Sequence, residues 1–513
     1  MGHLRMVSPM NLARAFAESA NKNPTKPALY WGEEEFTYHD LWTQSLAVCE
    51  RLQNEFGIKP GMRAAIWLKN CPQFIPALFG VLETGAAVVP INNFLKPDEV
   101  NFILTDAEVD LVITDLSMAE GAAKLAALRP GLRFLHVEDF PRHPTGPAQD
   151  TSCEMSESDL AIIIYTSGTT GRPKGAMLSH GNLLHNVESC RRVLETVGED
   201  RIVVLLPMFH SFMLSVGILL PMLIGGTIVL IKSVHPLKNI VQEIIHRHAT
   251  ILPAVPQLFR TLMHPSIPTD LPLRICVSGG APLPGEILKE FSARFPMPLI
   301  EGYGLSEASP VVTFNPIRKQ KAGSIGVPIY DVEVTVQNDA GEILGIRQTG
   351  EICVRGGNVM QGYWNQIEET ARTMRGEWLL TGDIGHQDEE GYFYITDRKK
   401  DMLLVNGINV YPREIEEIIY QFPGVKEAAV VGVPDSRRGE QALAFVSAQE
   451  GIVLDEKAIQ HFIRDKLADY KVPKRVVILP SLPRNPTGKI LKTALRELAQ
   501  RTDATPDNGK AQV

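Results

Sequence analysis

The stretch from Leu160 to Gly175, LAIIIYTSGTTGRPKG, joins a continuous apolar run to a turn rich in glycine and hydroxyl residues. An apolar run of this length predicts a strand that is buried on both faces. The turn ends in Arg172 and Lys174, so flexible backbone, hydroxyl groups and fixed positive charge stand together. Backbone amides and basic side chains in such a turn bind phosphate. The stretch therefore predicts a buried strand that leads into a phosphate-binding loop, with a plain surface loop as the alternative.

The same kind of short apolar run recurs between helical stretches up to about residue 395. Examples are AAIWL, GAAVVP, DLVIT, RIVVLLP, TIVLI, ATILPAVP and LRICVSGG. Apolar runs separated by helices predict parallel strands and hence an α/β architecture. Over residues 327–354 the alternating pattern of DVEVTVQNDAGEI and TGEICVRG instead predicts antiparallel hairpins or a small barrel.

The length of the chain, 513 residues, exceeds what one ordinary core accommodates, so we expect at least two domains. After ITDRKKD the pattern changes to that of a compact α+β unit of roughly one hundred residues. We predict a large domain over residues 1–397, a hinge at 398–400, a smaller domain over 401–503 and a frayed tail at 504–513.

Composition excludes several classes of protein. A net charge of -8 argues against a nucleic-acid-binding surface. The six cysteines form no CxxC pair, which favours a reducing compartment over a disulfide framework or a zinc site. The first residues lack the apolar core of a signal peptide, so we expect a cytoplasmic protein. The uncharged run over 203–231 is long enough to span a membrane, but its prolines and glycines favour a buried helix and strand.

The phosphate loop does not match a P-loop, which reads GxxxxGK[ST]. Counted from Gly168, Lys174 falls at the lysine position. However, Pro173 occupies the position of the second glycine, and Gly175 replaces the hydroxyl residue that holds magnesium. A P-loop nucleotidase is therefore disfavoured, and another kind of phosphate chemistry must be sought in the rest of the chain.

Two further loops follow apolar runs, VSGGAPLPGEI over 277–287 and LIEGYGLSEASP over 299–310. Loops at the ends of parallel strands gather ligands. Tyr303 stands between two glycines, an aromatic face with cleared space that would suit a nucleobase. Glu307 offers a hard oxygen for Mg²⁺, although a solvated loop carboxylate would look the same. Asp383 in LLTGDIG could hold ribose hydroxyls or stabilise a turn.

Several blocks in a fixed order carry a family resemblance. They are YTSGTTGRPKG, LPMFH, SGGAPL, EGYGLSE, TGEICVRGGNVMQGYWN, TGD, DRKKDMLLVNGINVYPREIE and PRNPTGKILK. Together they cover nearly the whole chain, which resembles adenylate-forming enzymes of the acyl-CoA synthetase type. The stretches GYGLSEASPVVTFNP and RPKGAMLSHGNL are similar to those of bacterial medium- and long-chain fatty acid–CoA ligases. The resemblance implies a reaction with ATP, Mg²⁺ and coenzyme A, and a small C-terminal domain that moves about the hinge.

The resemblance also implies site residues. The catalytic residues would be Lys489, His210, Glu307 and Lys400, with Lys400 at the hinge. ATP and AMP would be bound by Thr166, Ser167, Gly168, Thr169, Thr170, Lys174, Gly280, Ala281, Pro282, Glu301, Gly302, Tyr303, Gly304, Leu305, Ser306, Asp383, Ile395, Arg398 and Lys489. The acyl pocket would contain His210, Ser211, Leu214, Gly279, Gly280 and Val311. Asn406 and Gly407 would contact coenzyme A, and Glu307 and Thr166 would hold Mg²⁺.

The predicted acyl pocket has an apolar character. The stretch SFMLSVGILLPMLI after His210 contains no basic residue to pair a second carboxylate, which favours a medium- or long-chain fatty acid over a diacid. Leu214 replaces the tryptophan gate of some long-chain members, and an aryl acid such as benzoate or cinnamate remains an alternative. So does a fatty acyl-AMP ligase, although the insertion typical of that group is not evident. Contact with a membrane surface and a homodimer are further expectations.

Overall fold

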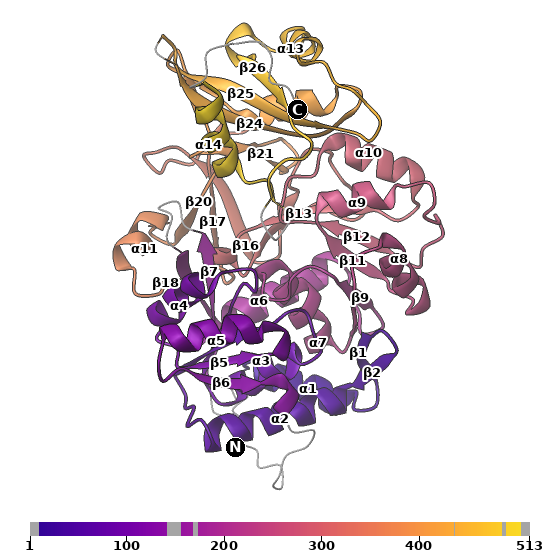
Figure 1. Cartoon of the computed structure of the whole chain (residues 1–513), viewed down its shortest axis with the longest axis vertical. Coiled ribbons are helices and arrows are strands. Elements are labelled where there is room, and N and C mark those ends of the chain that lie inside the picture. Colours follow the sequence, from indigo (N-terminus) through magenta and orange to yellow (C-terminus); the bar gives the residue numbers. More distant parts are fainter. Residues whose placement is uncertain (1–9, 141–154, 168–172, 436, 485–488, 504–513) are drawn as a thin grey trace, which may run out of the picture.

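The computed structural model describes residues 10–140, 155–167, 173–435, 437–484 and 489–503. Two large sheets form the body of the molecule, and an orange-to-yellow C-terminal part stands at one end of its long axis (Figure 1). The α/β class predicted from the apolar runs is confirmed, since all seven of those runs lie in strands with parallel neighbours. The exact division into domains at 397 and 401 stays a prediction.

The first sheet has nine strands in the order β15-β14-β13-β12-β11-β9-β10-β1-β2. Its central strands are parallel, and its edges pair antiparallel. The strands are β15 (Val327–Pro328), β14 (Val311–Phe314), β13 (Leu299–Gly304), β12 (Ile275–Ser278), β11 (Ile251–Ala254), β9 (Arg201–Val204), β10 (Thr227–Leu230), β1 (Pro27–Trp31) and β2 (Glu34–Thr37).

The second sheet has seven strands in the order β18-β8-β7-β4-β3-β5-β6. The opening stretch of sequence supplies β7, which pairs parallel with β4 and antiparallel with β8. The strands are β18 (Gly362–Tyr363), β8 (Pro173–Ser179), β7 (Leu160–Ser167), β4 (Ala87–Pro90), β3 (Arg63–Trp67), β5 (Leu111–Thr114) and β6 (Arg133–His136).

Helices cover both faces of each sheet, which explains the continuous apolar runs. Successive side chains of a strand point to opposite faces. In β10, Ile228 and Leu230 join the core between the sheets, whereas Val229 joins the outer core beneath α8, α9 and α10 (Figure 1). The outer helices are α8 (Leu237–His246), α9 (Pro256–Leu262) and α10 (Gly285–Arg294) on the first sheet, and α4 (Pro97–Asp106) and α5 (Ala119–Leu128) on the second.

The central layer lies between the two sheets and holds the largest core. It contains α1 (Leu12–Lys22), α2 (Tyr38–Asn54), α3 (Phe74–Glu83), α6 (His180–Val193), the π-helical segment η3 (Met213–Leu219) and α7 (Leu220–Ile224). Most of the uncharged run over 203–231 is therefore buried core, as β9, η3, α7 and β10. Among the described residues, no helix combines the length and apolar character needed to cross a membrane.

Beyond these sheets the pairing becomes mainly antiparallel. A five-stranded sheet consists of β16 (Val332–Gln337), β17 (Gly350–Gly356), β20 (Trp378–Gln387), β19 (Met374–Arg375) and β21 (Phe393–Arg398). The short helix α11 (Ile367–Thr373) lies between β18 and β19. Hairpin pairing over 327–354 is thus confirmed, with the described strands in an open order rather than a closed barrel.

The C-terminal part has its own sheet and its own core. The strands are β23 (Ile408–Val410), β22 (Leu403–Val405), β25 (Gly439–Ala448), β24 (Val425–Asp435) and β26 (Arg475–Ile478). The helices are α12 (Pro412–Tyr420), α13 (Glu456–Arg464) and α14 (Lys492–Asp503). Two hydrophobic clusters fill this part, one on each face of the sheet.

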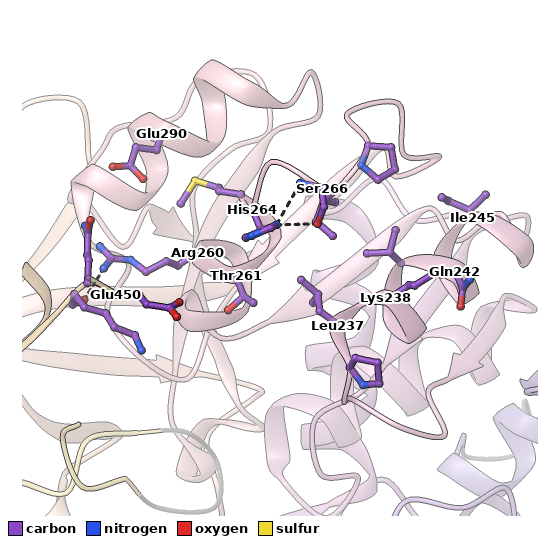
Figure 2. Close-up of a pocket in the computed structure, with 17 residues that line it drawn as sticks. Leu237, Lys238, Gln242, Ile245, Arg260, Thr261, His264, Ser266, Glu290 and Glu450 are labelled. Carbon is purple, nitrogen blue, oxygen red and sulfur yellow. Dashed lines mark hydrogen bonds between the residues drawn. The ribbon is translucent and has the colours of Figure 1, made fainter. Parts of the chain in front are cut away.

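Polar contacts join the C-terminal part to the body. Arg260 on α9 donates a hydrogen bond of 2.6 Å from Nη1 to the carbonyl of Lys426 (Figure 2). The backbone N–H of Arg413 donates to Asp397 Oδ2 at 2.7 Å. A cleft of about 1000 Å³ opens beside Arg260, between α8, α9 and the ends of β24 and β25. None of the predicted site residues lines this cleft, so it is separate from the candidate active site.

Candidate active site

The loops after β12 and β13 occupy the carboxyl end of parallel strands, where α/β sheets bind ligands. After β12, Gly280 has φ +77°, a conformation that favours glycine. Ala281 and Pro282 continue this loop toward α10. The side chain of Glu301 on β13 accepts a hydrogen bond of 3.1 Å from the N–H of Leu283. Burial raises the pKa of Glu301 to about 7. The loop after β12 is thus bound to β13 through Glu301.

The glycines on either side of Tyr303 have a different role from the one expected. A Cβ on Gly302 would lie 2.2 Å from the ring of Phe314, and one on Gly304 would lie 2.1 Å from the carbonyl of Pro310. Phe314 belongs to β14, and Pro310 is the residue directly before this strand. The expectation of cleared space for a ligand is therefore wrong at these positions, because neighbouring protein atoms fill the space.

Tyr303, Asp383 and Arg398 form one polar cluster. The phenol of Tyr303 donates a hydrogen bond of 2.6 Å to Asp383 Oδ2. Arg398 Nε lies 2.8 Å from Asp383 Oδ1. Burial, followed by the charge of Asp383, raises the pKa of Tyr303. The Asp383 carboxylate raises the pKa of Arg398. Both oxygens of Asp383 are engaged, so a ribose would have to share or replace these partners.

Glu307 and Thr166, the predicted metal ligands, are brought together from separate sheets. Glu307 lies in the 3₁₀ turn η4 (Ser306–Ala308), and its Oε1 is 3.5 Å from the hydroxyl of Thr166 at the end of β7. The same oxygen accepts a hydrogen bond of 2.8 Å from the phenol of Tyr363. Tyr363, on β18, was not predicted as a site residue, because only pairing with β8 brings it here.

These residues fit a magnesium ion that is shared with a polyphosphate. Mg²⁺ is held in such sites by one or two protein oxygens together with phosphate oxygens and water. In the part of the chain that the structure describes, no group of three or more His, Cys, Asp or Glu side chains gathers around a metal position. Glu307 and the Thr166 hydroxyl would be the protein's contribution.

The phosphate loop is described at its two ends. Gly168, Thr169, Thr170 and Arg172 lie outside the described residues. Ser167 pairs with Pro173, and Thr166 pairs with Lys174, in the β7/β8 hairpin. Lys174 is 6% exposed and forms an ion pair with Glu369 of α11. The predicted lysine is thus held at the base of the loop.

Two further cations lie near the Asp383 cluster, Lys400 at the predicted hinge and Lys489 in the C-terminal part. Burial and the nearby Arg398 charge lower the pKa of Lys489 to about 8. Burial and the same charge lower the pKa of Lys400. Lys489 is nevertheless an exposed residue, so water stabilises its charged form and limits this lowering of its pKa. The gathering of Arg398, Lys400 and Lys489 creates a site that attracts an anion.

His210 lies close enough to Lys489 for the lysine charge to affect it. Burial, followed by the Lys489 charge, lowers the pKa of His210 to about 4, so the imidazole is neutral at pH 7. The N–H of Phe212 donates to His210 Nδ1 at 3.3 Å. Because Nδ1 accepts, the proton lies on Nε2. His210 therefore offers a neutral N–H donor.

Of the predicted acyl-pocket residues, Ser211 and Leu214 lie at the start of η3, and Gly279 faces Phe212 just before it. Leu214 and Val311 are buried, and the hydroxyl of Ser211 lies 3.1 Å from that of Ser306. A Cβ on Gly279 would lie 3.1 Å from the Phe212 ring. The wall after His210 is π-helical, a form that is often found at functional sites. The site thus places an apolar wall beside the polar groups.

Three predicted residues lie at the edge of this site or away from it. Ile395 packs with Tyr303 against the small core of the antiparallel sheet. Asn406 and Gly407 form the exposed turn of the β22/β23 hairpin, and both have positive φ. An Asn-Gly pair is favoured in such a two-residue turn, so local geometry also accounts for Gly407.

Comparisons with known proteins identify the family of the chain. The family model described as AMP-binding enzyme matches residues 16–364, and the one described as AMP-binding enzyme C-terminal domain matches 414–489. A long-chain-fatty-acid–CoA ligase of Bacillus subtilis (strain 168) is 36% identical, over 95% of this chain and 94% of the relative. A feruloyl-CoA synthase of Amycolatopsis sp is 35% identical, over 93% of this chain and 96% of the relative.

A solved structure shows the same fold. The crystal structure of ATP-bound MatB from Rhodopseudomonas palustris has a TM-score of 0.88 and 31% sequence identity, and the match covers 96% of this chain and all of the other. Fold and site together define an enzyme that binds a nucleotide. The chain belongs to the AMP-binding enzyme family, and within it to the AMP-forming acid–thiol ligases.

Proposed function

We propose that the protein ligates a medium- or long-chain fatty acid to coenzyme A through an acyl-adenylate, with release of AMP and pyrophosphate. The observation that carries the proposal is the meeting of Lys489, Arg398 and Asp383 with the neutral His210 and its apolar wall. Cations beside an apolar wall are what a carboxylate on a long chain requires.

The predicted nucleotide residues have distinct places in this proposal. The loops around Gly280 and Tyr303 would hold adenine, together with Ile395. Asp383 and Arg398 would hold the ribose, with Glu301 binding the loop after β12 to β13. Ser306 would contact the α-phosphate, and Leu305 would contribute backbone. Lys174 and the loop from Thr166 to Thr170 would hold the β- and γ-phosphates.

In the first step, an oxygen of the fatty acid carboxylate attacks the α-phosphorus of ATP, and pyrophosphate leaves. Negative charge increases on the α-phosphate during this attack, so preorganised cations supply most of the catalysis. Lys489 would bridge the carboxylate and the α-phosphate. The N–H of His210 would orient the carboxylate. Mg²⁺, when bound, would neutralise charge on the departing phosphates.

In the second step, the thiolate sulfur of coenzyme A attacks the acyl carbon and AMP leaves. We propose that the C-terminal part, residues 401–503, turns about the hinge at 398–400 and exchanges Lys489 for the hairpin of Asn406 and Gly407. Lys400 would absorb the backbone change. The separate core of this part supports the proposal, because such a unit can move without disturbing the body.

The identity of the acid substrate is the most specific part of the proposal. The pocket wall is apolar through Leu214 and Val311, and the Bacillus relative is named for long-chain fatty acids. The Amycolatopsis relative is named for an aromatic acid, which keeps an aryl acid as the second candidate. A membrane contact would follow from a substrate that partitions into lipid. A homodimer and a cytoplasmic location stay predictions.

One assay tests the proposal. Pyrophosphate release and acyl-CoA formation are measured with ATP and Mg²⁺ for acids from acetate to oleate, and for benzoate and a cinnamate, each with and without coenzyme A. We expect thioester formation with decanoate to oleate. Turnover limited to the aromatic acids would overturn the choice of substrate. Adenylate without thioester would indicate a fatty acyl-AMP ligase.

A further inference from the structure

The ion pair of Lys174 with Glu369 is the feature that the proposed chemistry leaves unexplained. Lys174 is almost fully buried, and its ammonium lies 5.4 Å from the centre of the Tyr363 ring. Glu369 comes from α11, 195 residues further along the chain, and its Oε1 accepts from Lys174 Nζ. The lysine assigned to phosphate binding thus already has an anion.

A buried ammonium needs such an anion whenever phosphate is absent. Removing a charge from water without a partner is strongly unfavourable. The face of Tyr363 offsets only a fraction of that cost. Without Glu369, the empty site would hold an uncompensated charge at the base of the phosphate loop.

Glu369 can give up Lys174 without being left unpaired. Its other oxygen, Oε2, lies 3.5 Å from Arg372 Nη1 on the same helix. The Glu369 side chain is 19% exposed, so water can reach the carboxylate. No residue of α11 is buried, so packing restrains this helix only weakly. If Lys174 exchanges Glu369 for a phosphate, Glu369 therefore still has Arg372 and water as partners.

The surroundings connect this pair to the rest of the phosphate site. The ring of Tyr363 lies under the Lys174 ammonium, and its phenol donates to Glu307, the predicted magnesium ligand. Thr370, next to Glu369, accepts a hydrogen bond of 2.9 Å from the N–H of Tyr363. Tyr363 thus contacts Glu307 through its phenol oxygen and Lys174, the partner of Glu369, through its ring face.

We propose that Glu369 is a stand-in for phosphate: it neutralises Lys174 in the empty site, yields it to the β- and γ-phosphates of ATP, and takes it back as pyrophosphate leaves. This inference rests on the proposed function, specifically on Lys174 as a phosphate ligand. Glu369 acts through Lys174 and is therefore a positioning residue. Its competition weakens binding of pyrophosphate and so speeds product release.

The competition predicts a selective effect of Glu369→Gln, which keeps the shape of the side chain and removes its charge. A charge-assisted contact is about twice as strong as a neutral one, so Kd for inorganic pyrophosphate should fall about tenfold. Kd for AMP, which has no β- or γ-phosphate, should stay the same. If the role of Glu369 were purely structural, the substitution would weaken the binding of pyrophosphate and of AMP together. Isothermal titration calorimetry of the full-length protein with pyrophosphate or AMP as the titrant, in the presence of Mg²⁺, measures both Kd values.

Glu368→Gln is the matched control. It removes the same charge from the adjacent residue of α11. There the side chain is 91% exposed and, among the residues that the structure describes, pairs only with Arg372, at 3.6 Å. We expect no change in either Kd. An equal tightening of pyrophosphate binding in both variants would mean a general effect of net charge, which would overturn the assignment to Glu369.

Lys174→Ala separates failure of this inference from failure of the proposed function. It should weaken pyrophosphate binding, and adding Glu369→Gln to it should change nothing more. If Lys174→Ala leaves pyrophosphate binding intact, Lys174 is not a phosphate ligand, and its role in the proposed function fails together with this inference. If it weakens binding but Glu369→Gln does not tighten it, only the stand-in role fails. Glu369→Asp, which shortens the reach to Lys174, should tighten binding too and serves if the glutamine variant folds poorly.

Discussion

Asp383 and Arg398 stand directly opposite each other on β20 and β21, and their side chains form an ion pair of 2.8 Å. The register of two antiparallel strands therefore fixes the relative position of these two predicted ribose ligands. Tyr303 reaches the same carboxylate from the first sheet. The cluster joins the antiparallel sheet, the predicted hinge and the predicted nucleotide-binding residue Tyr303 at one carboxylate.

Removing the charge of this carboxylate should weaken nucleotide binding. Asp383→Asn keeps the size of the side chain but loses the ion pair with Arg398, so we expect KM for ATP to rise about tenfold. Steady-state kinetics with ATP varied would show this. Asp339→Asn is the control, because Asp339 is 91% exposed and pairs only with Lys399 in the described structure. An unchanged KM in Asp383→Asn would contradict the ribose assignment.

Replacing Lys489 should affect the two half-reactions unequally. Lys489→Ala should slow adenylate formation by at least about a hundredfold, the scale for losing one preorganised contact to the transition state. Thioester formation from a supplied acyl-adenylate should change little, because the proposed rotation takes Lys489 away. Single-turnover assays of each step separate the two. Equal losses in both steps would argue against the exchange of Lys489 for the hairpin.

The pH dependence follows from the same lysine. Its pKa is lowered to about 8, below the usual value of 10.5, and the protonated form is the one that binds the anionic transition state. For the adenylation step, kcat/KM should therefore fall as the pH rises through about 8, and not only near pH 10. His210, with a pKa near 4, stays neutral across this range and adds no step. A profile that is flat up to pH 10 would refute the assignment.

A methyl group at Gly279 should narrow the acyl pocket. The added carbon would lie 3.1 Å from the Phe212 ring, so the ring has to shift by a small amount. For long acids we expect kcat/KM to fall about tenfold, the scale of one methylene group in an apolar pocket, with a smaller loss for short acids. In the control, Gly345→Ala, the carbon meets only the Gln348 side chain at 3.5 Å. Equal losses for all chain lengths would place Gly279 outside the pocket.

Local patterns in the sequence predicted where strands occur better than they predicted which strands pair with each other. Runs such as RIVVLLP and TIVLI identify β9 and β10 because burial on both faces requires continuous apolar residues. The position of β1 next to β10 depends on contacts nearly 200 residues apart, as the register of Leu29 with Ile228 shows. No local period encodes such a pairing. The strands β1, β2 and β6 were not predicted at all.

The same limit applies to the site. Glu307 and Asp383 lie inside the family blocks, and the family resemblance therefore predicted a role in the site for each of them. Tyr363 also lies in a block, but its bond to Glu307 appears only when β18 pairs with β8. Gly302 and Gly304 were misinterpreted, because a glycine alone does not show whether a ligand or a neighbouring strand fills its space.

The separate cores have a thermodynamic consequence. Among the described residues, the clusters of the C-terminal part begin at Leu403, and those of the body end at Ile395, so no cluster includes side chains from both. Two cores joined mainly by polar contacts unfold as separate cooperative units. A calorimetric scan of this chain should therefore contain two heat-absorption peaks, and a single melting temperature would describe neither unit.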